Sequence, residues 1–317
     1  MGITILLLVL SLVALYFGAE WLVRGSSSLA LRASISPLVV GLTVVAFGTS
    51  SPELVVSLNA TLSGQGDIAA GNVIGSNIFN IALILGLSAI VYPLQAKVQL
   101  FKIDIPVMLV ATLLFTLLFW DGSLGRIEGG LFFLGVLVYT SMSLYYSRKK
   151  KETADETNND NSMKVLKHWT LDIGLIIIGL IILVFASDLL VKQAVIIAQA
   201  VGISEAVTGL TIVAAGTSMP ELATSIVAAT KKQSDIAIGN IVGSNIFNIL
   251  AIMGLSALVH PITALQVNHI DLLVMTGVSL LLLPLVRTGF RINRWEGILL
   301  VSIYVVYTIY LLYGTTA

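Results

Sequence analysis

One half of this chain repeats the other. Residues 41–94 align without a gap to residues 209–262, and about 33 of the 54 paired positions are identical at a constant offset of 168 residues. The same offset pairs the segment from Arg126 to Gly129 with the segment from Arg294 to Gly297, so the similarity extends through each half. A repeat of this kind predicts two copies of one structural unit in a single chain.

Long apolar segments fill nearly all of the sequence. Hydrophobic residues make up 57% of it and charged residues only 11%, against about 25% charged in a soluble domain. Apolar runs of about 20 residues cross a bilayer as helices. We expect ten such helices, at 2–22, 37–62, 68–91, 103–120, 127–147, 171–199, 205–229, 236–259, 271–286 and 295–313. The predicted fold is therefore all-α, that of a polytopic membrane protein.

The polar stretch between the halves is short. We expect a first five-helix repeat at residues 1–147, a cytoplasmic linker at 148–170 and a second five-helix repeat at 171–317. The linker has no apolar periodicity, which predicts a flexible segment, and it is too short to hold a regulatory domain. Because each half has an odd number of spans, equivalent residues start from opposite sides of the membrane, which predicts two inverted repeats.

The basic residues predict the orientation. Cytoplasmic loops accumulate Lys and Arg, and with the N-terminus outside, all of the 17 basic residues except Arg126 and Lys192 lie on the inner side. We therefore expect a multi-pass protein of the cell membrane with both termini extracellular. Because 17 acidic residues balance the 17 basic ones, no positive surplus indicates a nucleic-acid partner. The absence of cysteine excludes thiolate metal sites.

Two equivalent glutamates, Glu53 and Glu221, lie deep inside predicted spans with no basic residue in either repeat core to pair with them. A carboxylate at such depth is costly unless it is paired, protonated or solvated in a cavity. Each follows a proline, Pro52 or Pro220, which frees the carbonyl four residues earlier and interrupts the helix. Paired interruptions in two repeats indicate an ion site. The alternative is a protonated glutamic acid with a purely structural hydrogen bond.

The span after each glutamate supplies further oxygen ligands. The sequences GNVIGSNIFN and GNIVGSNIFN each place a serine and an asparagine four residues apart, on one helix face. Oxygen ligands with two carboxylates suit calcium or sodium rather than a transition metal. The predicted side-chain ligands are Glu53, Glu221, Thr49, Thr217, Ser50, Ser218, Ser76, Ser244, Asn80 and Asn248. Two ionised glutamates balance one calcium ion or two sodium ions, so we expect these ions to be transported and expect no cofactor.

Other polar residues have simpler explanations. Two aspartates that open a span are expected to cap a helix: Asp67 and Asp235. Two i, i+4 pairs of opposite charge are expected to form intrahelical ion pairs: Glu20 with Arg24, and Asp188 with Lys192. Three aspartates near span ends are expected to be solvated at the membrane interface: Asp104, Asp172 and Asp271.

With these motifs the chain resembles the calcium/cation antiporter superfamily. The segments GTSSPELVVS and GTSMPELATS, each followed by GSNIFN, are similar to its two alpha-repeats, most closely in prokaryotic sodium/calcium exchangers. The resemblance implies a secondary active transporter that exchanges sodium ions for calcium by alternating access. It implies calcium binding by the two glutamates with the backbone of the two threonines. For sodium it adds the serines and the carbonyls of Ala46 and Ala214, and the asparagines complete the central position.

The counter-ion leaves an alternative open, a calcium/proton or other divalent-cation antiporter. The resemblance favours sodium, because the calcium/proton branch carries a glutamate that is absent here. The potassium-dependent branch has aspartate at the position of Asn248, which argues against potassium cotransport. We expect no enzymatic activity, because no HExxH, GxSxG or Ser/His arrangement supports an intramembrane hydrolase. Interrupted helices in two halves favour alternating access over a passive channel. The oligomeric state is not indicated by the sequence.

Overall fold

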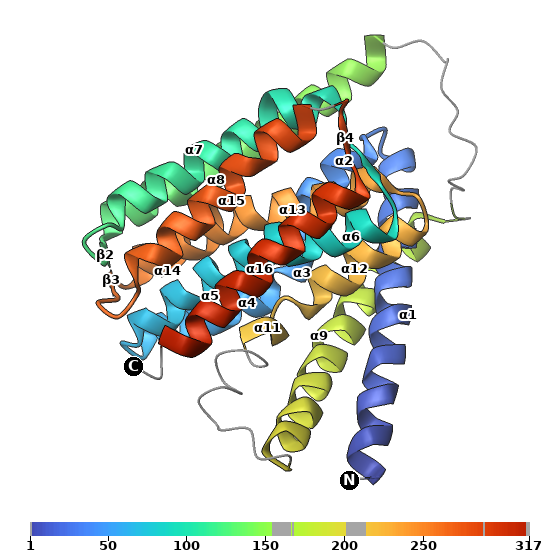
Figure 1. Cartoon of the computed structure of the whole chain (residues 1–317). Coiled ribbons are helices and arrows are strands. Elements are labelled where there is room, and N and C mark those ends of the chain that lie inside the picture. Colours follow the sequence, from blue (N-terminus) through green and yellow to red (C-terminus); the bar gives the residue numbers. More distant parts are fainter. Residues whose placement is uncertain (1, 154–165, 167, 201–213, 288, 315–317) are drawn as a thin grey trace.

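The computed structural model describes residues 2–153, 166, 168–200, 214–287 and 289–314, and most of them are helical (Figure 1). The first half contains α1 (Gly2–Arg32), α2 (Pro37–Val40), η1 (Gly41–Val45), α3 (Ala46–Thr49), α4 (Ser51–Leu62), α5 (Gly66–Ile78), η2 (Phe79–Leu85), α6 (Gly86–Val91), β1 (Leu94–Gln95), η3 (Leu100–Asp104), α7 (Ile105–Leu118), β2 (Ser123–Leu124) and α8 (Arg126–Thr153). The second half contains α9 (Trp169–Ala200), α11 (Ala214–Gly216), α12 (Met219–Thr230), α13 (Ser234–Phe247), η5 (Asn248–Met253), α14 (Gly254–Val259), β3 (Ile262–Thr263), α15 (His269–Arg287), β4 (Arg291–Ile292) and α16 (Arg294–Gly314). The η segments are π-helical turns that continue their neighbouring α-helices.

Eight of the described helices are long and apolar enough to cross a membrane. Two further helices, residues 37–49 and 51–62, meet at a bend of 47° and together are long and apolar enough to form one more span. The remaining predicted span, 205–229, begins outside the described residues, and most of the predicted linker lies outside them as well. The all-α, multi-pass class is thus confirmed. Two helices run well past the predicted ends of their spans. Helix α1 continues to Arg32, ten residues past residue 22, and α8 continues to Thr153, six residues past residue 147, because a helix propagates into a polar segment more readily than it stops.

Two continuous helices form the centre of the protein. The helix from α5 through α6 and the helix from α13 through α14 are 78% and 83% buried over their most apolar windows, against at most 50% for the other spans. The outer helices expose large apolar side chains instead, including Leu117 and Phe185 at 70% and 71% exposure. An apolar surface of this extent fits lipid rather than water. The central helices are therefore the ones placed to hold a site away from lipid.

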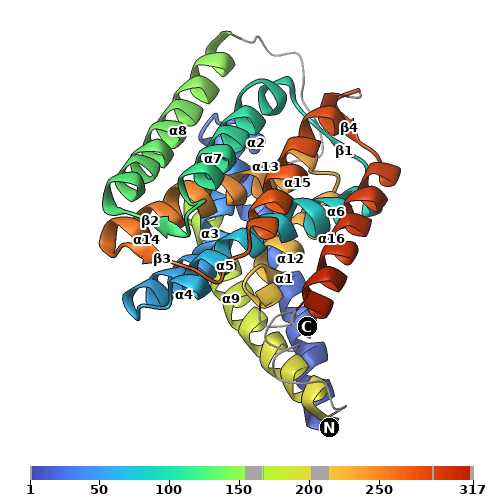
Figure 2. The same cartoon turned by 60° about the vertical axis from the view of Figure 1, so that its left-hand side comes forward.

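The long helices α1 and α9, which open the two halves, lie side by side and project beyond the rest of the bundle (Figures 1 and 2). Their backbones approach closely at Gly18 and Gly179. A methyl group added to Gly179 would lie 2.8 Å from the carbonyl oxygen of Gly18, which is closer than real side chains come. Small residues at a crossing allow this kind of contact between membrane helices.

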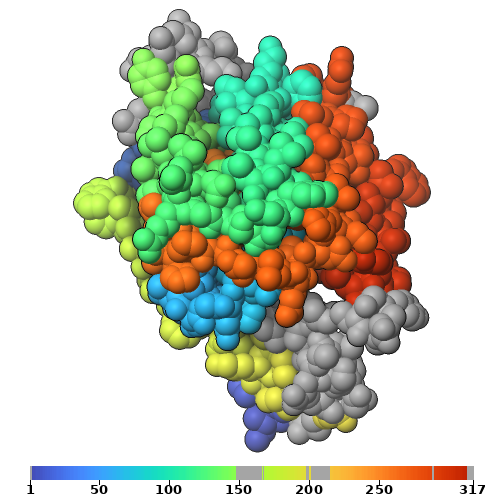
Figure 3. All heavy atoms as spheres, turned by 90° about the vertical axis from the view of Figure 1, so that its left-hand side faces the viewer, coloured from blue at the N-terminus to red at the C-terminus, as the bar shows by residue number. Residues whose placement is uncertain are grey.

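The loops of the two halves interlock at both ends of the bundle. Strand β1 pairs antiparallel with β4, and β2 pairs antiparallel with β3, so each two-stranded sheet joins one half to the other. Figure 3 shows the same interleaving on one face, where a band of the second half in orange lies between first-half segments in green and blue. The halves are therefore not separate side-by-side units.

The two aspartates expected to cap helices bond across the halves instead. Asp67 accepts the backbone N–H of Gln266 at 2.8 Å, and Asp235 forms an ion pair with Lys97. The residues at the N-cap positions are Gln65 and Gln233, so the capping prediction was wrong. The sequence pattern at a helix start does not reveal a loop of the other half that offers a better partner.

Protein partners also replace solvent at two of the three interface aspartates. Asp172 is fully buried and lies 2.7 Å from the guanidinium of Arg32, and Asp104 is fully buried and bonded to Tyr139. Solvation therefore does not explain these two carboxylates; protein groups do. Asp271 is half-buried and also accepts a tyrosine hydroxyl.

The predicted intrahelical pairs gave one success and one error. Asp188 and Lys192 form the expected pair at 2.7 Å on the exposed face of α9. Glu20 pairs with Lys231 of α12 at 2.7 Å instead of with Arg24. A contact between helices from different halves competes here with the local i, i+4 neighbour.

Candidate functional site

Both halves interrupt a helix at the same place. In the first half the break falls at Ser50, between α3 and α4, and in the second half at Ser218, between α11 and α12. Each break lies just before the proline-glutamate pair, because proline cannot donate a hydrogen bond to the preceding turn. The predicted interruption is confirmed in both halves. It puts Glu53 and Glu221 in the first turn of α4 and α12.

The carbonyls released by the two prolines find hydroxyl partners. Gly48 accepts the hydroxyl of Ser51, and Gly216 accepts the hydroxyl of Ser187 at 2.5 Å. These backbone groups are thereby satisfied at membrane depth without water. The helix break therefore serves to position the residues around it, and the oxygens available to a ligand come from side chains near the break.

The two glutamates are held by serines of the opposite half. Ser50 donates to the carboxylate of Glu221 at 2.9 Å, and Ser218 donates to the carboxylate of Glu53 at the same distance. Both glutamates are 1% exposed, and they are close enough to interact electrostatically. Each carboxylate therefore depends on both halves for its position.

Serine and asparagine side chains of the central helices complete the surroundings. Ser76 lies 3.0 Å from the hydroxyl of Ser218 and 3.5 Å from the carboxylate of Glu53. Asn248, the first residue of η5, donates to the side-chain oxygen of Asn77 in α5 at 3.1 Å. This bond links the two central helices where α13 passes into its π-helical turn. π-Helical turns commonly occur where a helix carries function.

The two predicted threonines bond to a pair of asparagines that sequence reasoning missed. Thr49 donates to Asn240 at 3.0 Å, and Thr217 donates to Asn72 at 3.3 Å, again from one half to the other. The amide of Asn72 in turn donates to the backbone carbonyl of Glu53 at 3.2 Å. Asn72 precedes Ser76 by four residues, so the same helix-face rule, applied one turn earlier, would have found it.

Several buried oxygens at this centre have no hydrogen-bond partner among the described residues. They are Glu53 Oε2, Glu221 Oε2, Asn80 Oδ1, Asn248 Oδ1 and Ser244 Oγ. A buried polar atom without a partner is costly, and carboxylate, amide and hydroxyl oxygens are hard ligands for calcium or sodium. The described part of the chain has no cluster of three or more His, Cys, Asp or Glu. The arrangement can hold a hard cation between two carboxylates.

Of the two predicted backbone ligands, the carbonyl of Ala46 already accepts hydrogen bonds. The carbonyl of Ala46 accepts the backbone N–H of Ser50 at 3.0 Å and the hydroxyl of Thr49 at 3.3 Å, so the helix and its break already engage it. Ala214 is the first residue of α11, directly after residues 201–213, which lie outside the described part.

A cavity of about 450 Å³ lies beside the site. Its walls include Asn72 and Thr217 and, farther along, residues of α15 and α16. The cavity is partly open, which gives the wall of the site a connection to the outside of the protein.

Comparison with known proteins gives a consistent result. The family described as sodium/calcium exchanger protein matches residues 3–145 and 171–313, one match in each half. The chain is 39% identical over 319 residues to the putative antiporter CaxA of Alkalimonas amylolytica, covering 98% of this chain and 99% of that protein. It is 32% identical over 351 residues to the sodium/calcium exchanger MaX1 of Methanosarcina acetivorans, covering 98% and 99%.

A solved structure is similar as well. The sodium-calcium exchanger NCX_Mj, soaked with 10 mM Na⁺ and zero Ca²⁺, matches with a TM-score of 0.83 and 33% sequence identity. The match covers 96% of this chain and 98% of the NCX_Mj chain, so the fold is shared along the whole length.

Proposed function

The chain belongs to the sodium/calcium exchanger family, and from that premise we propose that it exchanges sodium ions for calcium across a membrane by alternating access. The observation that carries the proposal is the crossed pair of serine-glutamate hydrogen bonds, each 2.9 Å long, around two buried carboxylates. This arrangement brings two negative charges to one place inside the bundle and leaves one oxygen of each free for a cation.

The proposed ion site consists of Glu53 and Glu221 with oxygens from the surrounding side chains. The free carboxylate oxygens and the unpartnered oxygens of Asn80, Asn248 and Ser244 would bind the cation. The remaining proposed ligands are Thr49, Thr217, Ser50, Ser218 and Ser76, with the carbonyls of Ala46 and Ala214. One calcium ion or two sodium ions would neutralise the carboxylates. An empty, doubly charged site would be penalised at membrane depth, which couples the movement of one ion to the other.

We propose that the chain has ten membrane spans in two inverted five-helix repeats, residues 1–147 and 171–317. Residues 148–170 would form a cytoplasmic linker, and both termini would be extracellular. The repeat offset of 168 residues makes β1 equivalent to β3 and β2 equivalent to β4. The pairing of β1 with β4 therefore becomes the pairing of β3 with β2 when the halves are exchanged, and this symmetry supports the arrangement. The excess of basic residues on one side of the proposed spans supports the orientation.

The test is calcium uptake into proteoliposomes that contain the purified protein. We expect uptake to require sodium inside the vesicles and to persist with a protonophore. Uptake that needs no sodium and disappears with the protonophore would instead indicate a calcium/proton antiporter.

The site is tested in the same vesicles. Glu53→Gln and Glu221→Gln should each abolish uptake, because each removes one of the two charges that bind the cation. Asp188→Asn is the control, since this aspartate forms an exposed ion pair on α9, away from the centre. Uptake retained in either glutamine variant would overturn the proposed site.

A further inference from the structure

Each half contains a tyrosine–aspartate hydrogen bond outside the glutamate site, with the two aspartates 167 residues apart in the chain. Tyr139 donates a hydrogen bond of 3.0 Å to Asp104, and Tyr307 donates one of 2.8 Å to Asp271. The tyrosines are related by the repeat offset of 168 residues, and each aspartate follows an isoleucine near the start of the preceding span. The same bond therefore joins the last two long helices of each half.

The pair in the second half lines the cavity that reaches the ion site. The half-buried Asp271 and Tyr307 lie in the wall of the 450 Å³ cavity, whose wall also includes Asn72 and Thr217. Those two residues bond to each other, and Asn72 also bonds to the backbone of Glu53. A single cavity thus connects Asp271 with Thr217, one of the proposed ligands, and with Asn72 beside Glu53.

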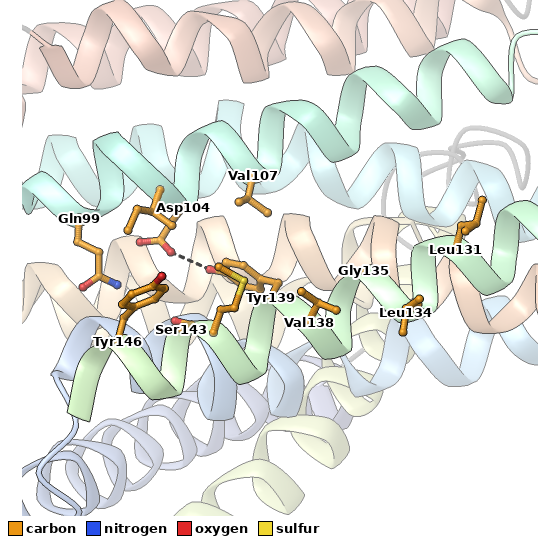
Figure 4. Close-up of a pocket in the computed structure, with 12 residues that line it drawn as sticks. Gln99, Asp104, Val107, Leu131, Leu134, Gly135, Val138, Tyr139, Ser143 and Tyr146 are labelled. Carbon is orange, nitrogen blue, oxygen red and sulfur yellow. Dashed lines mark hydrogen bonds between the residues drawn. The ribbon is translucent and has the colours of Figure 1, made fainter. Parts of the chain in front are cut away.

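The pair in the first half has different surroundings. Figure 4 shows Asp104 bonded to Tyr139 in a separate cavity of about 390 Å³. Residues of η3, α7 and α8 and Gln99 line that cavity, and none of the proposed ion ligands does. Asp104 itself is fully buried. Among the described residues that line these two cavities, the Asp271 pair therefore shares its cavity with a proposed ligand, and the Asp104 pair does not.

The cavity beside Asp271 has room for a hydrated cation and carries one carboxylate within a largely apolar wall. Asp271 is the only charged residue among the described residues that line it, and in the described part of the chain no Lys or Arg forms an ion pair with it. The hydrogen bond from Tyr307 uses one carboxylate oxygen, Oδ1. A cation with about six waters, at about 30 Å³ each, fits within the 450 Å³ volume.

We propose that Asp271 recruits hydrated sodium and calcium ions into the cavity that leads to the glutamate site, with Tyr307 holding its carboxylate in position. A carboxylate in a cavity with low-dielectric walls concentrates cations there and speeds their association. The proposal rests on the proposed exchange function and adds a residue that acts before the ions are bound. Asp271 is a positioning residue for the ion in transit and does not belong to the glutamate site.

The test measures the KM for calcium from each face of the membrane, in vesicles of uniform orientation at low ionic strength. Asp271→Asn should raise the KM about three- to tenfold from the extracellular face, where the start of α15 lies in the proposed orientation, with the maximal rate unchanged. The effect should shrink as salt screens the charge. Asp271→Glu should restore the KM. Asp104→Asn is the matched control and should leave the KM at that face unchanged.

A second variant distinguishes the effect of the Asp271 charge from the effect of the hydrogen bond that joins the two helices. Tyr307→Phe removes the hydrogen bond but keeps the carboxylate, so it should raise the KM less than Asp271→Asn does. Equal effects of the two variants, or an unchanged KM in Asp271→Asn, would overturn the inference while leaving the exchange function intact. Absence of sodium-dependent exchange in the unaltered protein would overturn both.

Discussion

A methyl group added to Gly243 should loosen the contact between the halves beside the ion site. Its Cβ would lie 2.6 Å from the carbonyl oxygen of Leu42 and 2.7 Å from the Cβ of Ala46, and neither atom can move without a shift of the backbone. Inserting a methyl group into a well-packed core costs about 1–3 kcal/mol. Replacing a helical glycine by alanine returns about 0.5–1 kcal/mol. We therefore expect Gly243→Ala to destabilise the protein by about 0.5–2 kcal/mol.

The repeat provides its own control for this prediction. Gly75 is the equivalent residue of the first half, and a Cβ there meets nothing within 4 Å among the described residues. Gly75→Ala should therefore stabilise the protein slightly, by the gain in helix stability that alanine has over glycine. The measurement is the apparent melting temperature of both variants in detergent at one fixed scan rate. A melting temperature of Gly243→Ala equal to or above that of Gly75→Ala would refute the reasoning.

Further predictions concern polar contacts between elements. Ser218→Ala removes a 2.9 Å hydrogen bond to the buried carboxylate of Glu53, which is worth about 1.5 kcal/mol. The rate of sodium-dependent calcium uptake should therefore fall about tenfold, and an unchanged rate would argue against the crossed bonds. Asp172→Asn breaks an ion pair whose carboxylate is fully buried, so it should lower the apparent melting temperature more than Asp188→Asn, whose ion pair is exposed. Thr116→Val leaves the buried hydroxyl of Thr276 without its 2.8 Å partner and should destabilise the protein by about 1–3 kcal/mol. Valine at both positions should restore part of this stability, which a double-mutant cycle of melting temperatures would detect.

Much of the site follows from the sequence because the repeat marks it twice. Glu53 and its counterpart stand out as carboxylates in apolar runs, and the adjoining proline predicts where the helix breaks. The sequence does not reveal whether each serine donates its hydrogen bond to the glutamate of its own half or to that of the other half. Ser50 is three residues from Glu53 in the chain, yet its hydroxyl bonds to Glu221, because the break turns it toward the other half.

Contacts between distant helices explain most of the errors. Asp104 looked like a solvated interface residue because nothing near it in sequence offers a partner. Its partner, Tyr139, is 35 residues away on the next long helix. The same holds for Glu20, whose partner Lys231 belongs to the other half. Local patterns rank near neighbours well, but they say nothing of partners that only packing brings together.

The exchange of serines between the glutamates also bears on how such a protein could arise. A five-helix half by itself would carry a glutamate without its hydroxyl donor and a serine without its acceptor. Two copies of that half, inserted into the bilayer in opposite directions, would supply each other with both. If the halves have the inverted arrangement proposed above, a gene of half this length would have sufficed to encode such a dimer before duplication and fusion joined the two copies in one chain.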